Sequence, residues 1–191
     1  GRSVSCFASS FRKKMGLGNP SPMGLLSFAV TTILDMYINM QWVESEFEAQ
    51  VVGYGIIYGG AIQAITGFFC LLKGDSYSCS LFVLFGAYWM SFGLIALESA
   101  RSTSDWNAEG GGAAYLKGTC GLKILFGFIT IGYLSIAPYK TKILTIILTL
   151  VVFTFFLLGI GKCVEDGQSR KGERMLKAGG YFGFAAGGLA L

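Results

Sequence analysis

Six long apolar segments, separated by short polar connections, constrain this chain more than any other feature. A helix needs about 20 mostly apolar residues to cross the roughly 30 Å hydrocarbon core of a bilayer. Five segments meet or approach that length, and they cover residues 23–41, 51–72, 80–97, 116–137 and 143–161. The sixth, residues 175–191, would reach only about 25 Å as a helix, so we expect it to continue beyond the end of this chain. The sequence predicts an all-α, polytopic membrane protein with six transmembrane helices.

The composition supports a membrane protein and excludes several classes of site. Charged residues make up 14% of the chain, against about 25% in soluble domains, and hydrophobic residues make up 53%. The chain has no histidine, which removes imidazole bases and imidazole metal ligands. Its five cysteines are an odd number without a CxxC pair, so we expect neither a disulfide scaffold nor a zinc site. The sequence also lacks GxSxG, Walker A and HExxH motifs, and we expect no enzyme activity, cofactor or metal.

Lysine and arginine counts predict the domain layout and the orientation. Residues 1–18 form a basic tail, and residues 19–191 form one six-helix transmembrane domain that ends in an incomplete helix. The tail carries four cations before the first helix, whereas the following connection, residues 42–50, carries none. Cytoplasmic loops are enriched in lysine and arginine, so we place the N-terminus in the cytoplasm. We expect the membrane to be the plasma membrane. The connection before the sixth helix opposes this orientation, because Lys162, Arg170 and Lys171 would lie on the outer face. The cations of the tail do not alternate with aromatic residues in a base-stacking pattern, so we expect no nucleic-acid partner.

A polar stripe runs along the first apolar segment. Phe28, Thr31 or Thr32, Asp35 and Asn39 recur at helical spacing on one face. One interpretation is that the hydroxyls bond to their own backbone and hold helices together. The other is a water-accessible path, which the aspartate and asparagine on the same stripe favour.

Two further helices carry small residues at four-residue spacing, which allows close helix packing. They are Gly55 and Gly59 in the second helix, in line with Gln63, and Gly179, Gly183 and Gly187 in the sixth. The glutamine differs from the glycines because a buried amide needs partners for two donors and an acceptor.

Two ionisable residues, Asp35 and Lys123, lie inside predicted spans. A charge at the bilayer centre costs about 2.5–3.5 kcal/mol on insertion scales, so such residues usually face a cavity or each other. In the alternative interpretation both lie near the headgroups, with the lysine side chain extended towards the interface.

Three motifs resemble a known family. Residues 19–25 (NPSPMGL), followed by Phe28 and by Thr31 and Thr32, resemble the signature NPAPLGL…F…TT of the acetate uptake transporter family. Residues 58–67 (YGGAIQAITG) resemble its YGGxxQxxAG, and residues 74–89 resemble its GNTFGxTAFxSYGxFW. The family includes bacterial succinate–acetate permeases and fungal acetate and ammonia-export proteins. The resemblance implies a six-helix subunit, a homohexamer and a path for small monocarboxylates in each subunit.

The resemblance also implies a narrow point in the path. Motif alignment places its three residues at Phe28, Phe85 and Val151. The family has an aromatic residue at the first position, more often a tyrosine at the second, and a leucine at the third. Lys123 stands where the family has a tryptophan, and we take it and Asp35 as candidates for setting the field or coupling to protons.

Carboxylates are bound by hydroxyl, amide and helix N-terminal donors. Candidate substrate-binding residues are therefore Asn19, Thr31, Thr32 and Gln63.

Three functions remain open from the sequence. The first is transport of acetate and similar monocarboxylates, including succinate, by a proton-coupled or channel-like route. The second is export of ammonium or ammonia, for which the acidic residues 44–48 are a faint indication. The third is a membrane scaffold or sensor that transports nothing, which would not need the polar stripe.

Overall fold

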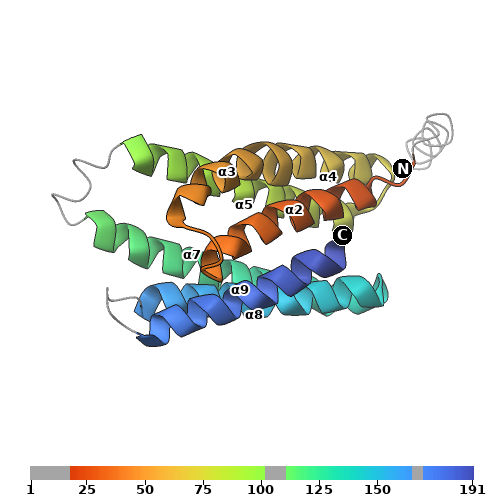
Figure 1. The fold of residues 1–191 in the computed structure, drawn as a ribbon. Helices are drawn as coiled ribbons and strands as arrows, with labels where there is room; N and C mark the ends of the chain where they lie inside the picture. Colours follow the sequence, from red (N-terminus) through yellow and green to blue (C-terminus); the bar gives the residue numbers. More distant parts are fainter. Residues whose placement is uncertain (1–17, 102–110, 165–169) are drawn as a thin grey trace.

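The computed structural model describes residues 18–101, 111–164 and 170–191, and these form a bundle of long helices (Figure 1). The helices are α2 (Ser21–Asn39), α3 (Glu48–Tyr54), α4 (Gln63–Leu72), α5 (Ser76–Arg101), α7 (Gly111–Ile136), α8 (Lys142–Val164) and α9 (Arg170–Ala190). A π-helical segment, η2 (Gly55–Ile62), joins α3 and α4 into one continuous rod, and short 3-10 turns lie at Ser45–Phe47 (η1) and Ala137–Tyr139 (η3). The described residues thus contain six rods, which confirms the predicted all-α fold class.

Five of these rods are long and apolar enough to cross a membrane, namely α2, α3 to α4, α5, α7 and α8. The sixth, α9, is less apolar because its first two turns carry charged residues. That this helix is incomplete as a membrane span stays a prediction, although it is longer than the apolar pattern indicates. It begins at Arg170 rather than at residue 175, and its 21 residues extend about 31 Å.

Helix α5 begins earlier than the apolar pattern predicts, at Ser76 rather than Ser80. The residue before it, Asp75, accepts hydrogen bonds from the backbone N–H and the hydroxyl of Ser78, at 3.2 and 2.6 Å. An aspartate that bonds to the first turn in this way stabilises a helix start. Lys140 pairs with the same carboxylate at 2.9 Å. Burial acts to raise the pKa of Asp75, but the Ser78 and Lys140 hydrogen bonds outweigh it and hold the pKa below its ordinary value.

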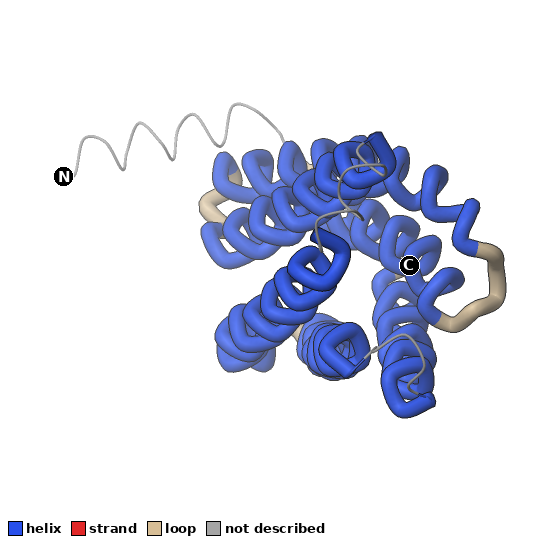
Figure 2. Tube along the Cα trace, turned by 90° about the vertical axis from the view of Figure 1, so that its left-hand side faces the viewer, coloured by secondary structure: helices blue, strands red, loops and turns tan. Residues whose placement is uncertain are grey.

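The helices are neighbours in the order α5, α4, α2, α9, α8, α7. Figure 2 shows the same bundle turned by 90°, with the rods gathered around a central region. Within the described part of the chain, α5 and α7, at the two ends of this series, are not among the pairs in close backbone contact. These two helices meet through side chains instead: the Tyr77 hydroxyl donates to the Tyr133 carbonyl at 2.8 Å, and the ring centroids of Tyr88 and Phe126 lie 4.7 Å apart.

The glycine spacing accounts for the close packing of α9. A Cβ added at Gly187 would lie 2.7 Å from Ile33 of α2, and one at Gly179 would lie 2.9 Å from Leu158 of α8. In the second rod, a Cβ at Gly59 would lie 2.7 Å from the Thr31 hydroxyl. These distances are too short for a side chain, which confirms that the glycine faces form tight helix contacts. The contacts lie within one subunit.

A disulfide joins Cys120 of α7 to Cys163 of α8, and their Cα atoms are 5.4 Å apart. The sequence predicted no disulfide scaffold, and for this pair the prediction was wrong. The two cysteines lie 43 residues apart, so the pairing depends on the packing of α7 against α8. Cys70 and Cys79 are free.

Candidate functional site

Two small cavities lie inside the bundle, and we name them by their polar residues. The charged cavity, of about 30 Å³, contains Asp35 and Lys123. The neutral cavity, of about 20 Å³, has Gln63 in its wall. Volumes of this size hold one or two water molecules. The charged cavity is lined by Phe28, Thr32, Asp35, Met36, Phe85, Tyr88, Trp89, Lys123, Val151, Thr154, Phe155, Leu158 and Gly183.

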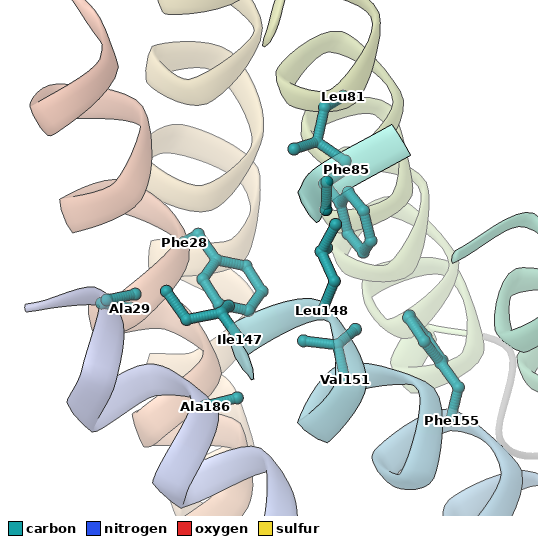
Figure 3. Packing of buried hydrophobic residues seen from close by; sticks show 11 residues of the cluster. Phe28, Ala29, Leu81, Phe85, Ile147, Leu148, Val151, Phe155 and Ala186 are labelled. Carbon is teal, nitrogen blue, oxygen red and sulfur yellow. The ribbon is translucent and has the colours of Figure 1, made fainter. Parts of the chain in front are cut away.

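Three residues line both cavities and so lie between them. They are Phe28 of α2, Phe85 of α5 and Val151 of α8, and their side chains converge in the centre of the core (Figure 3). Each is at most 8% exposed. The rings of Phe28 and Phe85 meet edge to face, with centroids 6.1 Å apart. These are the three residues that motif alignment places at the narrow point, and the structure brings them together from three helices.

The polar stripe of α2 divides between the charged cavity and a helix contact. Thr32 and Asp35, four and seven residues after Phe28, line the charged cavity with it. Thr31 points instead at Gly59 of the second rod and lines neither cavity. Asn39 donates a hydrogen bond to the backbone carbonyl of Asp35 at 3.0 Å, which matches the helix-stabilising interpretation. The stripe is therefore divided between a helix contact and a cavity wall, and a water-accessible path along it stays a prediction.

Lys123 is buried in the bundle and not extended towards the headgroups. Its side chain reaches inwards from α7 and is 8% exposed. The ammonium nitrogen donates to the hydroxyl of Tyr88, 3.3 Å away, and its charge acts on the Asp35 carboxylate in the same cavity. The alternative in which this lysine lies at the membrane surface is wrong. The cavity is thus lined by one basic and one acidic side chain.

Several buried polar atoms in or beside the cavities have no hydrogen-bond partner among the described residues. They are the hydroxyls of Thr31 and Thr32, the carbonyl oxygen of Gln63 and the indole N–H of Trp89. Other buried hydroxyls, such as those of Thr66, Thr130 and Thr154, donate to the carbonyl four residues earlier in their helix. Because buried polar groups are normally paired, the first set can bond to water or to a polar solute.

Asn19 lies apart from the other candidates. It is exposed at the start of α2, where its side-chain oxygen accepts the backbone N–H of Ser21 at 3.2 Å. It lines neither cavity. Its place is at one end of the bundle, and the sequence alone had grouped it with Thr32 and Gln63.

Among the residues of the charged cavity that the sequence analysis did not single out, four lie on α5 and α8 beside the narrow point. They are Tyr88, Trp89, Thr154 and Phe155. A helical-spacing argument could have found them, because they lie three or four residues after Phe85 and Val151 and therefore share their faces. Tyr88 and Phe155 pack edge to face, with centroids 5.4 Å apart, and close the cavity on the α5 to α8 side.

Comparison with known proteins finds relatives whose names describe membrane transport. It is 26% identical over 170 residues to acetate permease A of Emericella nidulans, which covers 88% of this chain and 57% of the permease. It is 27% identical over 175 residues to ammonia transport outward protein 3 of Saccharomyces cerevisiae, covering 86% and 57%. The chain thus spans a little more than half the length of these relatives.

A shorter match joins this chain to the succinate-acetate/proton symporter SatP of Escherichia coli, with 30% identity over 89 residues, 47% of this chain and 46% of the symporter. The solved structure of the bacterial acetate channel SatP shares the fold, with a TM-score of 0.79 and 24% identity over 91% of this chain and 88% of that one. The model of the GPR1/FUN34/yaaH family matches residues 7–191. That match confirms the resemblance found in the motifs and shows that this chain belongs to the GPR1/FUN34/yaaH family.

Proposed function

We propose that this multi-pass membrane protein moves acetate and similar small monocarboxylates across the bilayer. One observation carries the proposal. Phe28, Phe85 and Val151 are the residues common to two cavities that follow each other through the bundle. A line of cavities divided by a narrow apolar point is the arrangement of a selective path, in which a solute leaves one hydrated site and enters the next.

The side chains suit a small carboxylate. In the charged cavity, the Lys123 ammonium and the Tyr88 hydroxyl supply charge and a donor for the anion. Across the narrow point, the Gln63 side chain places a polar amide in the wall of the neutral cavity. Between them, the phenyl rings accept a methyl group but force the carboxylate to lose water. Desolvating a second carboxylate costs several kcal/mol more, so succinate should pass more slowly than acetate.

The narrow point is closed in this structure. Cavities of about 30 and 20 Å³ hold one or two waters each, and acetate has four heavy atoms. Passage therefore requires the phenyl rings at the narrow point to rotate. Because the rings of Phe28 and Phe85 are in edge-to-face contact, we expect them to move together.

The test is uptake of radiolabelled acetate and succinate into proteoliposomes, with and without a pH gradient. Phe28→Ala or Phe85→Ala should raise the succinate-to-acetate flux ratio several-fold before transport is lost. Phe68→Ala is the matched control, because Phe68 is 57% exposed and lines neither cavity. If both cavity variants assemble and keep the wild-type ratio, the narrow point lies elsewhere. Uptake that depends on the pH gradient indicates proton coupling. Uptake that is independent of the gradient indicates a channel.

Ammonium export is the second candidate, and Asp35 favours it. Its carboxylate lies in the charged cavity beside Trp89, and carboxylates and aromatic rings attract cations. Lys123 in the same cavity opposes a cation, which is why we place acetate first. The same proteoliposomes distinguish the two, since an ammonium exporter would dissipate an ammonium gradient and leave acetate untouched.

We also propose that the N-terminus is cytoplasmic and that the protein lies in the plasma membrane. The disulfide supports this orientation independently of the cation count. Cys163 lies where α8 ends, whereas free Cys70 lies beside Ser21 at the opposite end of the bundle, where α2 begins. Disulfides persist on the oxidising side of a membrane, so the Cys163 end should face outwards.

A cysteine introduced at Glu44 tests this orientation, with the native free cysteines replaced by serine. It should react with an impermeant maleimide added to intact cells, whereas a cysteine at Tyr139, which is 88% exposed at the other end, should not. The reverse pattern would overturn the orientation.

We further propose a homohexamer. Large apolar side chains are exposed on several helices, including Ile57, Phe128 and Ile143, and they can pack against lipid or against a neighbouring subunit. Native mass spectrometry of the protein in mild detergent should give six subunits. A monomer that transports after reconstitution would contradict this.

A further inference from the structure

A groove of about 340 Å³ opens along the side of the bundle between α5 and α7. Figure 1 shows the end of α5 and the start of α7 standing apart at one end of the molecule. The groove is more than ten times larger than the charged cavity, 340 against 30 Å³. It falls in the size range of sites for small organic ligands.

The walls of this α5–α7 groove are mainly apolar. Leu84, Phe92 and Ile95 line it from α5, and Leu122 and Phe126 line it from α7. Its length on α7, from residue 118 to residue 126, is about 12 Å. Acetate, with a single methyl group, would leave most of these walls uncovered, so the groove fits a longer aliphatic chain.

One cation faces into the otherwise apolar groove. Lys123 and Tyr88 line the groove as well as the charged cavity, and the lysine is 92% buried. The ammonium nitrogen lies 3.3 Å from the Tyr88 hydroxyl, so the two groups present their polar atoms at one place. A carboxylate bound there would gain a charge-assisted hydrogen bond, which is shorter and stronger than a neutral one. A neutral acyl chain would gain apolar contacts alone.

We propose that the α5–α7 groove binds a medium-chain alkyl carboxylate such as octanoate. The carboxylate lies at Lys123 and Tyr88, and the alkyl chain lies along the apolar walls. The alkyl chain lies outside the path proposed for acetate, and the carboxylate shares the lysine and the tyrosine with that path. Its ligand class follows from the pairing of one buried cation with a long apolar surface.

Two glycines of α7 provide a matched pair of variants. Gly118 lines the groove and Gly121 does not. Both are exposed, and a Cβ added at either would meet no atom within 4 Å. The first atom of a side chain therefore has room at either position. Gly118→Leu fills the groove, and Gly121→Leu places the same side chain on the same helix outside it.

The experiment measures equilibrium binding of radiolabelled carboxylates to the protein in phosphatidylcholine nanodiscs at pH 8, with empty discs subtracted. From butyrate through hexanoate to octanoate, affinity should rise about fourfold for each added methylene. Gly118→Leu should weaken octanoate binding at least about tenfold, and Gly121→Leu should leave it unchanged. Lys123→Met should weaken octanoate by about tenfold, the loss of one hydrogen bond to a charged group, and leave 1-octanol unchanged.

The proposal is overturned if Gly118→Leu and wild type bind octanoate equally, or if the affinity does not depend on chain length. It is also overturned if the Lys123→Met variant binds octanoate as tightly as wild type. Wild type that binds no octanoate, as when a neighbouring subunit covers the groove, also overturns it. If Lys123→Met does not assemble, the two leucine variants still decide the question. The readout is binding and not acetate flux, so its outcome is independent of the proposed transport.

Discussion

The protein places an aspartate and a lysine together in two different surroundings. At one end of the bundle, Asp75 and Lys140 form an ion pair at 2.9 Å with side chains about one third exposed, 35% and 38%. Inside the bundle, Asp35 and Lys123 line one cavity between five helices. The same two residue types thus occur once in contact with water and once among phenyl rings.

The difference lies in what surrounds each pair. Water and salt screen exposed charges, so a surface ion pair contributes between about 0 and 1 kcal/mol. Inside a membrane span, the free-energy cost of an isolated charge is several-fold higher than this contribution. Charged residues found there usually line a path or a site. The outer pair therefore helps to begin α5 and to hold it near α8, whereas the inner residues set the field that a passing ion meets.

The largest effect should come from removing the inner lysine. Lys123→Met leaves the Asp35 carboxylate as the charge in the cavity, and the local concentration of anions falls. Acetate flux in proteoliposomes should drop about tenfold or more. Lys140→Met, the matched change in the outer pair, should keep acetate flux within about twofold of wild type. Equal losses in the two variants would remove the distinction between the pairs.

A somewhat smaller effect of opposite sign should come from the inner aspartate. Asp35→Asn removes a negative charge from the path and keeps the shape of the side chain, so acetate flux should rise several-fold. Combined with Lys123→Met, it should recover part of the lost flux, because the two residues share a cavity and their effects are not additive. A double variant whose flux equals the product of the two single effects would show that they act independently.

The outer aspartate should matter for stability and not for transport. Asp75→Ala removes both the hydrogen bonds to Ser78 and the pair with Lys140, at a cost of about 1 kcal/mol. Asp75→Asn keeps a good helix-starting residue and loses only the charge, so it should cost less. Thermal unfolding in detergent measures both, with acetate flux as the control. A larger loss for asparagine than for alanine would contradict this account.

The smallest effect should be the pH dependence of the outer pair. The pKa of Asp75 lies below its ordinary value, since hydrogen bonds from Ser78 and Lys140 outweigh its burial. A carboxyl whose pKa is lower in the folded than in the unfolded state contributes its full stabilisation above the unfolded pKa, about 3.9. The contribution is lost as the pH falls from there through the folded pKa. The melting temperatures of wild type and Asp75→Asn should therefore differ by a constant amount between pH 5 and 8. They should converge only below about pH 4.

Part of the site could be predicted because motif spacing fixes faces along one helix. Phe28, Thr32 and Asp35 were grouped by helical spacing, and all three line the charged cavity. Thr31 was grouped with them by spacing but packs on Gly59 instead. Asn19, a separate substrate-binding candidate, lies at the helix start and lines neither cavity. Spacing cannot tell which neighbour a face meets, because that depends on how the helices cross.

The sequence by itself determined the fold class and most of the membrane-spanning helices. Apolar segments of about 20 residues cannot expose their backbone polar groups in lipid, so helices are the remaining choice. Tertiary structure alone decided that Lys123 turns inwards to Tyr88, that Cys120 meets Cys163 and that α5 and α7 leave a groove between them. These contacts join residues 35 to 43 positions apart, and they form only when distant helices pack side by side. Such packing depends on the fit of whole helix faces, which no local pattern in the sequence records.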